Sequence, residues 1–433
     1  MDFLEIIAKR RDGGKHSQKE LEFLACGAAK GKIPDYQIAA WLMAAYLKPL
    51  NSDETANLTL AMADSGERLD LSELPKPCLD KHSTGGVGDK TSIVVLPLLA
   101  ACGVTIVKMS GRGLGITGGT VDKLLSVPGF RMDLAPKELI EQAKKIGVAI
   151  TGQTPSLAPA DKVLYALRDV TATVDSIPLI VSSILSKKIA GGSQTIVLDV
   201  KCGSGSFQPN LDRARSLANA LKDTAHRCGL TLRIAITDMD QPLGRMIGNA
   251  LEVKEAIAVL QRKSRGRFRE LCLQLSGLAL EACGLAESRA EGYGRAQEAL
   301  ESRAAEHRAR KWFAAQGASD SVFENDDWAV APTIKKYILD GNEAFVSRIE
   351  ARTIGQAVVD LGGGRKKKDD VVDPSVGIEL HVEAGSRVKR GEALFTVHAK
   401  DSASADNAIE SIRAAFEFSQ KEVEPNPVVI EFV

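Results

Sequence analysis

Two glycine-rich segments constrain the fold of this chain more than any other feature of its sequence. The first, KHSTGGVGDKTS, covers residues 81–92, and the second, KMSGRGLGITGGT, covers residues 108–120. A strand-like run precedes each segment and a helical pattern follows it, as at the turns of an α/β sheet. Parallel strands place both turns at one edge of the sheet, which is where such proteins bind ligands.

The two segments also carry the chemistry of an anion-binding site. Glycines let the backbone turn tightly, and the free N–H groups at the start of a helix favour an anion. Lys81 adds a positive charge, and Ser83, Thr84 and Ser92 add neutral donors. One glycine loop is most often only a connector. Two loops with hydroxyl and basic side chains favour a phosphate cradle.

Common nucleotide-binding motifs do not account for these loops. Asp89 stands between Gly88 and Lys90, so the Gly-Lys-Thr order of a Walker A motif fails. Residues 111–115 space their glycines as G-x-G-x-G, which makes a dinucleotide-binding interpretation weak. The loops therefore indicate phosphate binding without a known nucleotide motif.

The texture of the sequence divides the chain into three regions. Residues 1–66 are a succession of helical patterns, and two more helices at residues 159–191 are expected to pack against them. Residues 75–155 and 192–330 alternate apolar runs with amphipathic stretches, which predicts a large, mostly parallel α/β domain. Residues 340–433 show short strand patterns and one late helix, which predicts a C-terminal β-rich α+β domain. The fold class is therefore α/β with a small helical domain and a β-rich C-terminal domain.

The composition argues against several kinds of partner. The 56 Lys and Arg residues balance 56 Asp and Glu residues, which removes the usual driving force for binding nucleic acid or an anionic membrane. The longest uncharged stretch, residues 91–107, is too short to span a bilayer, and the N-terminus lacks the apolar core of an export signal. The seven cysteines are scattered without a C-x-x-C motif, which favours reduced thiols and a cytoplasmic location.

Taken together, the two glycine-rich segments resemble the signature of the thymidine/pyrimidine-nucleoside phosphorylase family. The resemblance extends to YALRDV at residues 165–170, SILSKK at 183–188, LDVK at 198–201 and the C-terminal residues 377–395. It implies a pentosyltransferase that converts uridine, thymidine or deoxyuridine and inorganic phosphate reversibly to the free base and (deoxy)ribose 1-phosphate. It further implies a homodimer without an organic cofactor, in which the helical domain carries the base site and the dimer contact.

The resemblance also implies ligand positions in this chain. The implied phosphate-binding residues are Lys81, Ser83, Ser92, Ser110 and Thr120, and Lys108 on the second loop is expected to add charge. The implied base-binding residues are Tyr165, Arg168, Ser183 and Lys187.

The candidates for catalysis are Arg168, Lys187 and His82. The base leaves as a developing anion, so the cations Arg168 and Lys187 near its oxygens would stabilise that charge. Without the resemblance, Arg168 would be interpreted as a surface salt bridge with Asp161 or Asp169. His82 either donates a proton or hydrogen bond to the base carbonyl, or bonds the backbone of its own loop.

Position 90 departs from the family pattern. Several family members hold a potassium ion, and the matching positions here are Gly88, Lys90, Leu243, Met246 and Glu255. Position 90 is often threonine in the family. Either potassium binds here as well, or the ammonium of Lys90 occupies the place of the ion, and we expect activity to depend weakly on potassium. Ile116, at the second loop, replaces a histidine that many members have.

Two other functions compete with this interpretation. A phosphoribosyltransferase of the anthranilate type resembles the fold and uses a glycine loop, but it needs magnesium-binding acids, and no acidic pair follows the loops here. A non-catalytic nucleoside-binding scaffold would require lost ligands, whereas all the implied ligand positions are retained. The preferences for ribose or deoxyribose and for uracil or thymine stay open, because one methyl group changes binding only slightly.

Overall fold

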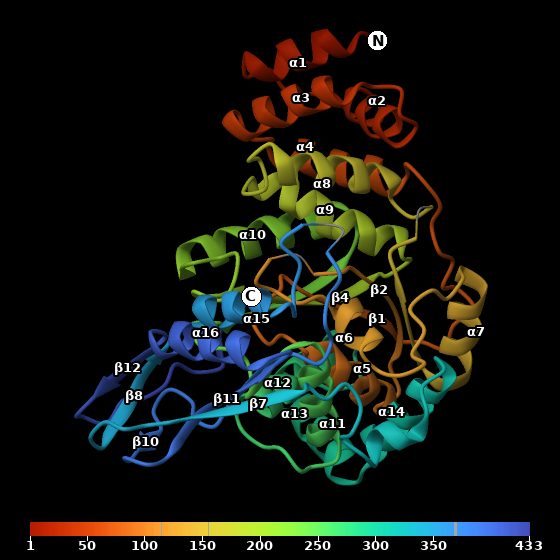
Figure 1. The fold of residues 1–433 in the computed structure, drawn as a ribbon. Helices are drawn as coiled ribbons and strands as arrows, with labels where there is room; N and C mark the ends of the chain where they lie inside the picture. Colours follow the sequence, from red (N-terminus) through yellow and green to blue (C-terminus); the bar gives the residue numbers. More distant parts are fainter. Residues whose placement is uncertain (114, 155, 368–369) are drawn as a thin grey trace.

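The computed structural model describes residues 1–113, 115–154, 156–367 and 370–433 and arranges them in three regions (Figure 1). A stack of helices lies at one end, a sheet covered by helices lies in the middle, and a strand-rich region lies beside the sheet.

The helical region joins two parts of the chain that are far apart in sequence. Trp41 from the first part and Leu164 and Leu179 from the second lie in one buried apolar core. The packing expected of residues 159–191 on the first helices is therefore observed. The helices of this region are α1 (Phe3–Arg11), α2 (Gln18–Ala29), α3 (Asp35–Leu47), α4 (Ser52–Ala63), α8 (Pro159–Val170) and α9 (Ile177–Ala190).

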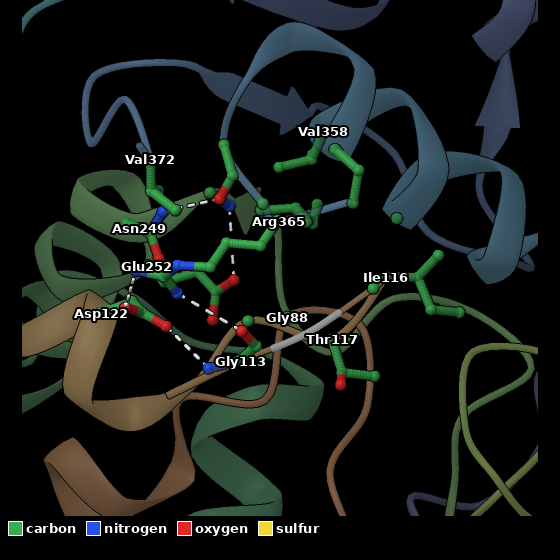
Figure 2. A pocket seen from close by; sticks show the side chains of 18 residues that line it. Gly88, Gly113, Ile116, Thr117, Asp122, Asn249, Glu252, Val358, Arg365 and Val372 are labelled. Carbon is green, nitrogen blue, oxygen red and sulfur yellow. Dashed lines mark hydrogen bonds and ion pairs between the residues drawn. The ribbon is translucent and has the colours of Figure 1, made fainter. Parts of the chain in front are cut away.

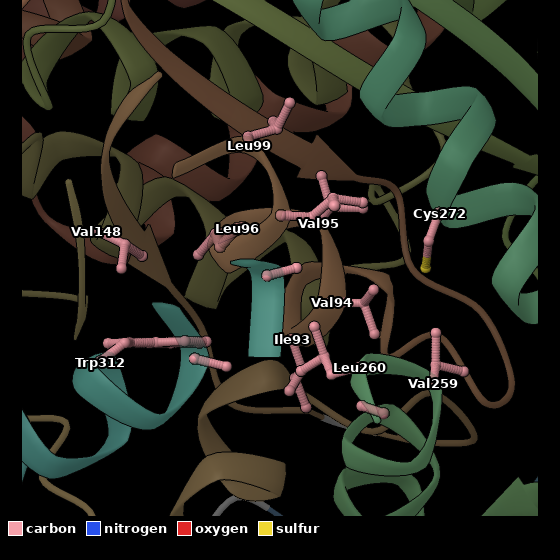
Figure 3. Packing of buried hydrophobic residues seen from close by; sticks show 14 of the residues in the cluster. Ile93, Val94, Val95, Leu96, Leu99, Val148, Val259, Leu260, Cys272 and Trp312 are labelled. Carbon is pink, nitrogen blue, oxygen red and sulfur yellow. The ribbon is translucent and has the colours of Figure 1, made fainter. Parts of the chain in front are cut away.

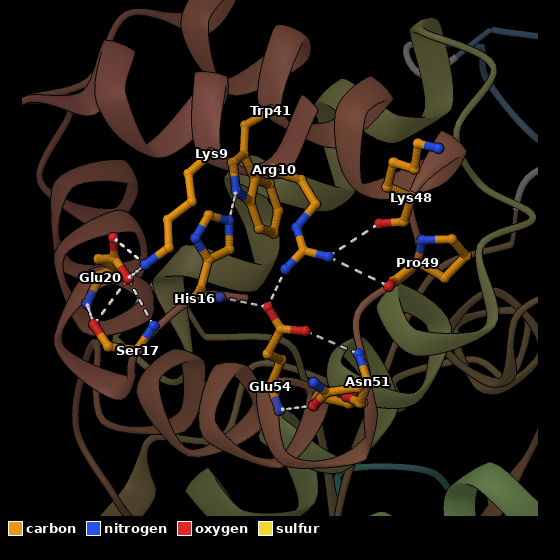
Figure 4. A network of polar contacts seen from close by, with 11 residues as sticks. Lys9, Arg10, His16, Ser17, Glu20, Trp41, Lys48, Pro49, Asn51 and Glu54 are labelled. Carbon is orange, nitrogen blue, oxygen red and sulfur yellow. Dashed lines mark hydrogen bonds and ion pairs between the residues drawn. The ribbon is translucent and has the colours of Figure 1, made fainter. Parts of the chain in front are cut away.

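A buried polar network connects the first helices of this region (Figure 4). The Glu54 carboxylate pairs with the Arg10 guanidinium and accepts the His16 backbone N–H at 2.6 Å. The Trp41 indole donates to Nε2 of His16 at 3.0 Å, so that nitrogen carries no proton. Burial, followed by the charge of Arg10, lowers the pKa of His16 to about 4.

A six-stranded sheet forms the centre of the second region. Its order is β13-β5-β4-β1-β2-β3, and only the edge strand β13 runs antiparallel to its neighbour. The strands are β1 (Cys78–Ser83), β2 (Thr105–Ser110), β3 (Val148–Gly152), β4 (Thr195–Cys202), β5 (Thr231–Asp238) and β13 (Val429–Phe432). Because β1 lies between β2 and β4, the loops after these three strands leave the sheet side by side at one edge.

Helices cover both faces of this sheet. Val197 of β4 packs into a core with α5 (Thr91–Ala101), while its neighbours Ile196 and Leu198 face α9 and α10 (Leu211–Arg227) on the other side. The helix α5 is apolar all round, and Ile93, Val95 and Leu99 are buried (Figure 3). The remaining helices here are α5 (Thr91–Ala101), α6 (Thr120–Leu125), α7 (Pro136–Ile146), α10 (Leu211–Arg227), α11 (Asn249–Leu260), α12 (Arg267–Ala282), α13 (Arg289–Glu301) and α14 (Ala304–Ala315), with a 3-10 helix at Asp320–Phe323.

The third region contains two small sheets and two helices. One sheet has the order β6-β9-β11-β7 and the other β10-β8-β12. The elements are β6 (Met246–Ile247), β7 (Thr333–Ile338), β8 (Ala344–Ile349), α15 (Ala351–Leu361), β9 (Gly377–Leu380), β10 (Arg387–Val388), β11 (Ala393–Ala399), α16 (Ser402–Arg413) and β12 (Phe416–Ser419). Since β6 follows β5 in the chain, it ties this region to the central sheet.

The α/β class, the mostly parallel sheet and the strand-rich C-terminal region are confirmed. Two details differ from expectation. Residues 429–432, placed by sequence in the C-terminal domain, instead form β13 and pair with β5, where they cover an otherwise open sheet edge. The C-terminal region also has a second helix, α15, which begins after the capping residue Glu350 and ends at Gly362 with φ +100°. Within the described residues, we find no helix with the length and apolarity needed to cross a membrane.

Candidate functional site

The first glycine loop follows β1 and leaves the sheet between the loops that follow β2 and β4. Its close contacts require glycine for steric reasons. Gly88 has φ +78°, and a side chain there would come within 2.7 Å of the Leu243 carbonyl oxygen. Thr84 fixes the loop to the next strand, because its hydroxyl accepts the Lys201 backbone N–H at 2.9 Å. The loop backbone is therefore held close to the ends of β4 and β5.

A buried lysine lies beneath this loop. Lys81 is fully buried, and its ammonium donates to the Thr91 hydroxyl at 2.5 Å. The neighbouring Asp89 accepts hydrogen bonds from Ser83 and from the Thr91 hydroxyl. Burial would raise the pKa of Asp89, but Lys201, Lys81 and Lys123 outweigh it and hold that pKa well below its usual range. The ionised Asp89 carboxylate therefore lies near three buried lysines, which come from β1, α6 and β4.

The second glycine loop folds back on itself and is joined to the first. A side chain on Gly113 would meet the Gly119 backbone nitrogen at 2.3 Å, so the two ends of the loop touch. Lys123 of α6 donates to the Asp89 carbonyl at 2.7 Å and pairs with Glu252 of α11 at 2.7 Å. The structure therefore brings together the two loops that were expected to form one cradle.

The implied phosphate-binding hydroxyls lie at the ends of these loops. Ser83 and Ser110 are the last residues of β1 and β2, Ser92 lies in the first turn of α5, and Thr120 begins α6. Each comes from a different element, and the parallel order of the strands places them on the same edge of the sheet.

Lys108 differs from its expected position. It lies within β2 rather than on the second loop, and its ammonium donates to the Lys81 carbonyl at 2.5 Å. It stands 3.7 Å from Asp80, which pairs more closely with Lys188 of α9 at 2.6 Å. Burial, followed by the charge of Lys188, lowers the pKa of Lys108 to about 7.

The implied base-binding side chains gather between α8 and α9. The Lys187 ammonium is 3.0 Å from the Ser183 hydroxyl and 2.5 Å from the Asp161 carboxylate. The Tyr165 ring has the Lys187 ammonium and the Arg168 guanidinium each 5.9 Å from its centre. Spacings of three and four residues on α8, and of four residues on α9, bring these side chains to the facing surfaces.

Arg168 is more enclosed than expected. It is 2% exposed, and its guanidinium donates to the carbonyl oxygens of Val174 at 2.6 Å and Leu179 at 3.0 Å. The alternative of a surface salt bridge is therefore wrong. Arg168 holds the connection between α8 and α9, and burial lowers its pKa.

His82 lies near two groups of cations: Lys81, Lys108 and Lys188 at the sheet edge, and Lys187 between α8 and α9. Desolvation, followed by Lys188, Lys108, Lys187 and Lys81, lowers the pKa of His82 well below its ordinary value. The consecutive residues Lys187 and Lys188 explain this arrangement, because the first faces Asp161 of the helical region and the second faces Asp80 of the sheet. The imidazole is neutral at physiological pH.

Lys90 lies among the residues that the resemblance linked to potassium. Its ammonium is 2.5 Å from the Glu255 carboxylate and 2.7 and 2.8 Å from the carbonyl oxygens of Leu243 and Met246. It also lies 5.0 Å from the centre of the Phe268 ring. Lys90 is 1% exposed, so all of its charge is balanced inside the protein.

Several charged residues of the site were not predicted from the sequence. They are Asp80, Asp89, Asp161, Lys123, Lys188 and Lys201. A usable signal existed for Lys201, because it lies in the apolar strand β4, where an unpaired charge would be costly. It pairs with Asp199 at 2.7 Å, and both side chains are fully buried.

The fold and this site together define a glycosyltransferase. Family models match residues 4–66 as the helical bundle domain and residues 75–306 as the a/b domain of a glycosyl transferase family. A solved structure, the anthranilate phosphoribosyltransferase of Thermus thermophilus, covers 73% of this chain and 99% of its own at a TM-score of 0.59. At 19% identity, that likeness shows a shared fold alone.

The remaining comparisons specify the family. Residues 345–419 match the pyrimidine nucleoside phosphorylase C-terminal domain. The pyrimidine-nucleoside phosphorylase of Geobacillus stearothermophilus is 46% identical over 401 residues, 92% of each chain. The thymidine phosphorylase of Sinorhizobium fredii is 42% identical over 428 residues, 98% of each chain. This chain therefore belongs to the thymidine/pyrimidine-nucleoside phosphorylase family, which confirms the resemblance found in the sequence.

Proposed function

We propose that this protein is a pyrimidine-nucleoside phosphorylase whose phosphate lies at the glycine loops and whose nucleobase lies between α8 and α9. The observation that carries the proposal is the back-to-back pair Lys187 and Lys188, whose ammonium groups face opposite sides of one site. Such a pair connects an anion site at the sheet edge to a second cationic site on the helices.

The proposed reaction uses these two sites at the same time. An oxygen of phosphate attacks C1′ of the sugar while the bond from C1′ to the base nitrogen breaks, and the base leaves with the electron pair. Lys81 and the loop donors hold the nucleophile in place, which turns an encounter in solution into an oriented attack. Lys187 stabilises the negative charge that develops on the base. Because its pKa is low, His82 acts as a neutral hydrogen-bond donor rather than as a cationic acid.

The direct test is phosphate-dependent release of the base. Uridine, thymidine and deoxyuridine are incubated separately with the purified protein, with and without phosphate, and the free base is measured by chromatography. We expect release only with phosphate, and the three rates give the substrate preference. Release of no base from any of them would contradict the proposal, and a requirement for magnesium and a diphosphate sugar would favour the phosphoribosyltransferase alternative.

We also propose that Lys90 replaces potassium in this chain. The residues do not fit a bound potassium ion, because an ammonium group already stands within hydrogen-bond distance of Glu255, Leu243 and Met246. The charge of the ammonium equals that of the ion, so the same oxygens are satisfied. The catalytic steps above therefore need no potassium ion at this position.

Exchange of the monovalent cation tests this replacement. We expect the wild-type protein to keep its activity and melting temperature when potassium is replaced by tetramethylammonium. In Lys90→Thr, potassium but not tetramethylammonium should raise both. Loss of most wild-type activity in tetramethylammonium would show that the protein needs an ion after all.

The helical region supports a homodimer. Leu4 of α1 and Tyr36 and Leu47 of α3 are large apolar side chains that are 58%, 74% and 67% exposed. A second copy of the chain would cover them. Light scattering should give twice the mass of the chain for the wild type and a lower mass for Tyr36→Lys; a monomeric wild type would contradict the proposal.

The cysteines are free thiols, which suits a cytoplasmic enzyme.

A further inference from the structure

The C-terminal region contacts both glycine loops, although no residue of that region was assigned to a substrate (Figure 2). Arg365 follows α15, is 9% exposed and pairs with Asp122 of α6 at 2.9 Å. Its guanidinium also contacts the Gly113 carbonyl at 3.3 Å, and its own carbonyl accepts the Gly115 N–H at 3.1 Å. One residue of the third region thus holds the second glycine loop through two contacts and the helix that follows it through a third.

Asp122 transmits this contact to the loop. One carboxylate oxygen pairs with Arg365, and the other accepts the Gly113 backbone N–H at 2.7 Å. Asp122 lies two residues after Thr120, which is an implied phosphate ligand. A displaced Asp122 would therefore shift both the loop backbone and the start of α6.

Apolar packing also holds the two glycine loops against the C-terminal region. Val87 of the first loop is buried within the core of the C-terminal region rather than that of the sheet. A side chain on Gly355 of α15 would come within 2.7 Å of Val87 and 3.0 Å of Ile116. The close approach of α15 to both loops requires glycine at this position.

We infer that Arg365 is a positioning residue for phosphate, through which the C-terminal region sets the shape and charge of the second glycine loop. The inference rests on the proposed function, because it assumes that phosphate binds at these loops. Two effects contribute. The Arg365 guanidinium holds the Gly113 carbonyl and the Asp122 side chain that accepts the Gly113 N–H, and it neutralises the Asp122 carboxylate, whose negative charge would otherwise repel phosphate.

Kinetics of Arg365 variants test this role. We expect Arg365→Ala to raise the KM for phosphate about tenfold or more, as for the loss of a buried charged hydrogen bond, and to change the KM for the nucleoside less than about twofold. Arg365→Lys should recover part of the loss. The control is Arg348→Ala, which removes an exposed ion pair with Glu417 in the same region and should change neither constant.

A double variant separates the two effects. If the uncompensated carboxylate repels phosphate, Asp122→Asn in the Arg365→Ala background should lower the KM for phosphate again, since asparagine still accepts the Gly113 N–H. Equal changes in the KM values for phosphate and nucleoside in Arg365→Ala would overturn the role. If Arg365→Ala does not fold, as judged by its melting curve, Arg365→Lys and the double variant provide the same comparison.

Hydrogen exchange gives a readout that needs no activity. In Arg365→Ala, the Gly113 amide should exchange faster than in the wild type, because its acceptor Asp122 loses its partner, while Arg348→Ala leaves this amide unchanged. Unchanged exchange would overturn the inference even if the enzyme is active. Absence of phosphate-dependent cleavage in the wild type, with faster exchange in Arg365→Ala, would instead contradict the proposed function and leave the structural contact established.

Discussion

The fold holds the two cationic clusters of the site in different ways. The cluster between α8 and α9 lies in one region, and side chains three or four residues apart on two helices bring Tyr165, Ser183 and Lys187 together. The cluster at the sheet edge draws on β1, β2, β4 and α6, and a further residue from the C-terminal region, Arg365, braces it. A helix pair orients its side chains by local geometry, whereas a set of loops needs support from several regions.

The clusters also differ in how their charges are balanced. Lys187 has the Asp161 carboxylate at 2.5 Å. Among the ion pairs of the described residues, Lys81 makes none, and its ammonium contacts the neutral Thr91 hydroxyl. A buried ammonium without a carboxylate partner is poised to bind an anion. A partnered ammonium is held in a fixed direction, as needed to stabilise charge on a leaving base.

The largest expected effect is a loss of kcat/KM on replacing Lys81 or Lys187, which should fall on different kinetic constants in the two variants. We expect Lys81→Met and Lys187→Met each to lower kcat/KM by about 10²–10³-fold, the size of losing one oxyanion-type donor. In Lys81→Met the KM for phosphate should rise, whereas in Lys187→Met kcat should fall for the nucleoside at saturating phosphate. Steady-state kinetics with each substrate varied in turn measure this split.

Lys162→Met is the matched control, since Lys162 is exposed on α8 beside the base cluster. It should keep the kinetics of the wild type, and circular dichroism should show that all three variants are folded. If Lys81→Met and Lys187→Met change the same constant, the assignment of one cluster to each substrate is wrong.

The same contrast explains what could be predicted from the sequence. The spacing of Ser183 and Lys187 on one helix is local, and the glycine loops mark strand ends. The positions of both clusters along the chain can therefore be predicted from the sequence. The pairing of Lys188 with Asp80 depends on how α9 docks on β1, which no local pattern contains. The contact of Arg365 with Asp122 joins residues 243 positions apart, counted from 365 − 122, and could not be found from either segment alone.

A second expected effect is a loss of stability of the helical region in acid. His16 accepts the Trp41 indole N–H, and burial lowers its pKa to about 4. The unfolded chain takes up a proton on this histidine near pH 6.5, while the folded chain resists protonation until about pH 4. Stability is therefore full above about pH 6.5 and falls as the pH drops through this window, by up to about 3 kcal/mol at about 1.4 kcal/mol per pKa unit.

Denaturant unfolding at several pH values, followed by tryptophan fluorescence, measures this loss. His16→Gln is the comparison, because glutamine can still accept the Trp41 hydrogen bond but does not titrate. Its unfolding free energy should fall less steeply than that of the wild type between pH 6.5 and 4. Parallel curves for the two proteins would mean that other groups cause the acid sensitivity of the helical region.

The smallest expected effect lies on the alkaline side and concerns the sheet edge. Burial and Lys188 lower the pKa of Lys108 to about 7, so this ammonium begins to lose its charge as the pH rises through that value. A bound phosphate opposes this loss by attracting the proton, which moves the change to somewhat higher pH. The KM for phosphate should therefore rise by less than about tenfold between pH 7 and 9, since one partly screened charge is removed.

In Lys108→Met the KM should start higher and change less, and this variant also corrects for the ionisation of phosphate itself. The nucleoside should show no matching rise, because Lys108 contacts the sheet edge and not the α8–α9 cluster. Parallel pH profiles of the phosphate KM in the two proteins would show that Lys108 keeps its charge throughout, and would place it with the fully partnered lysines of the site.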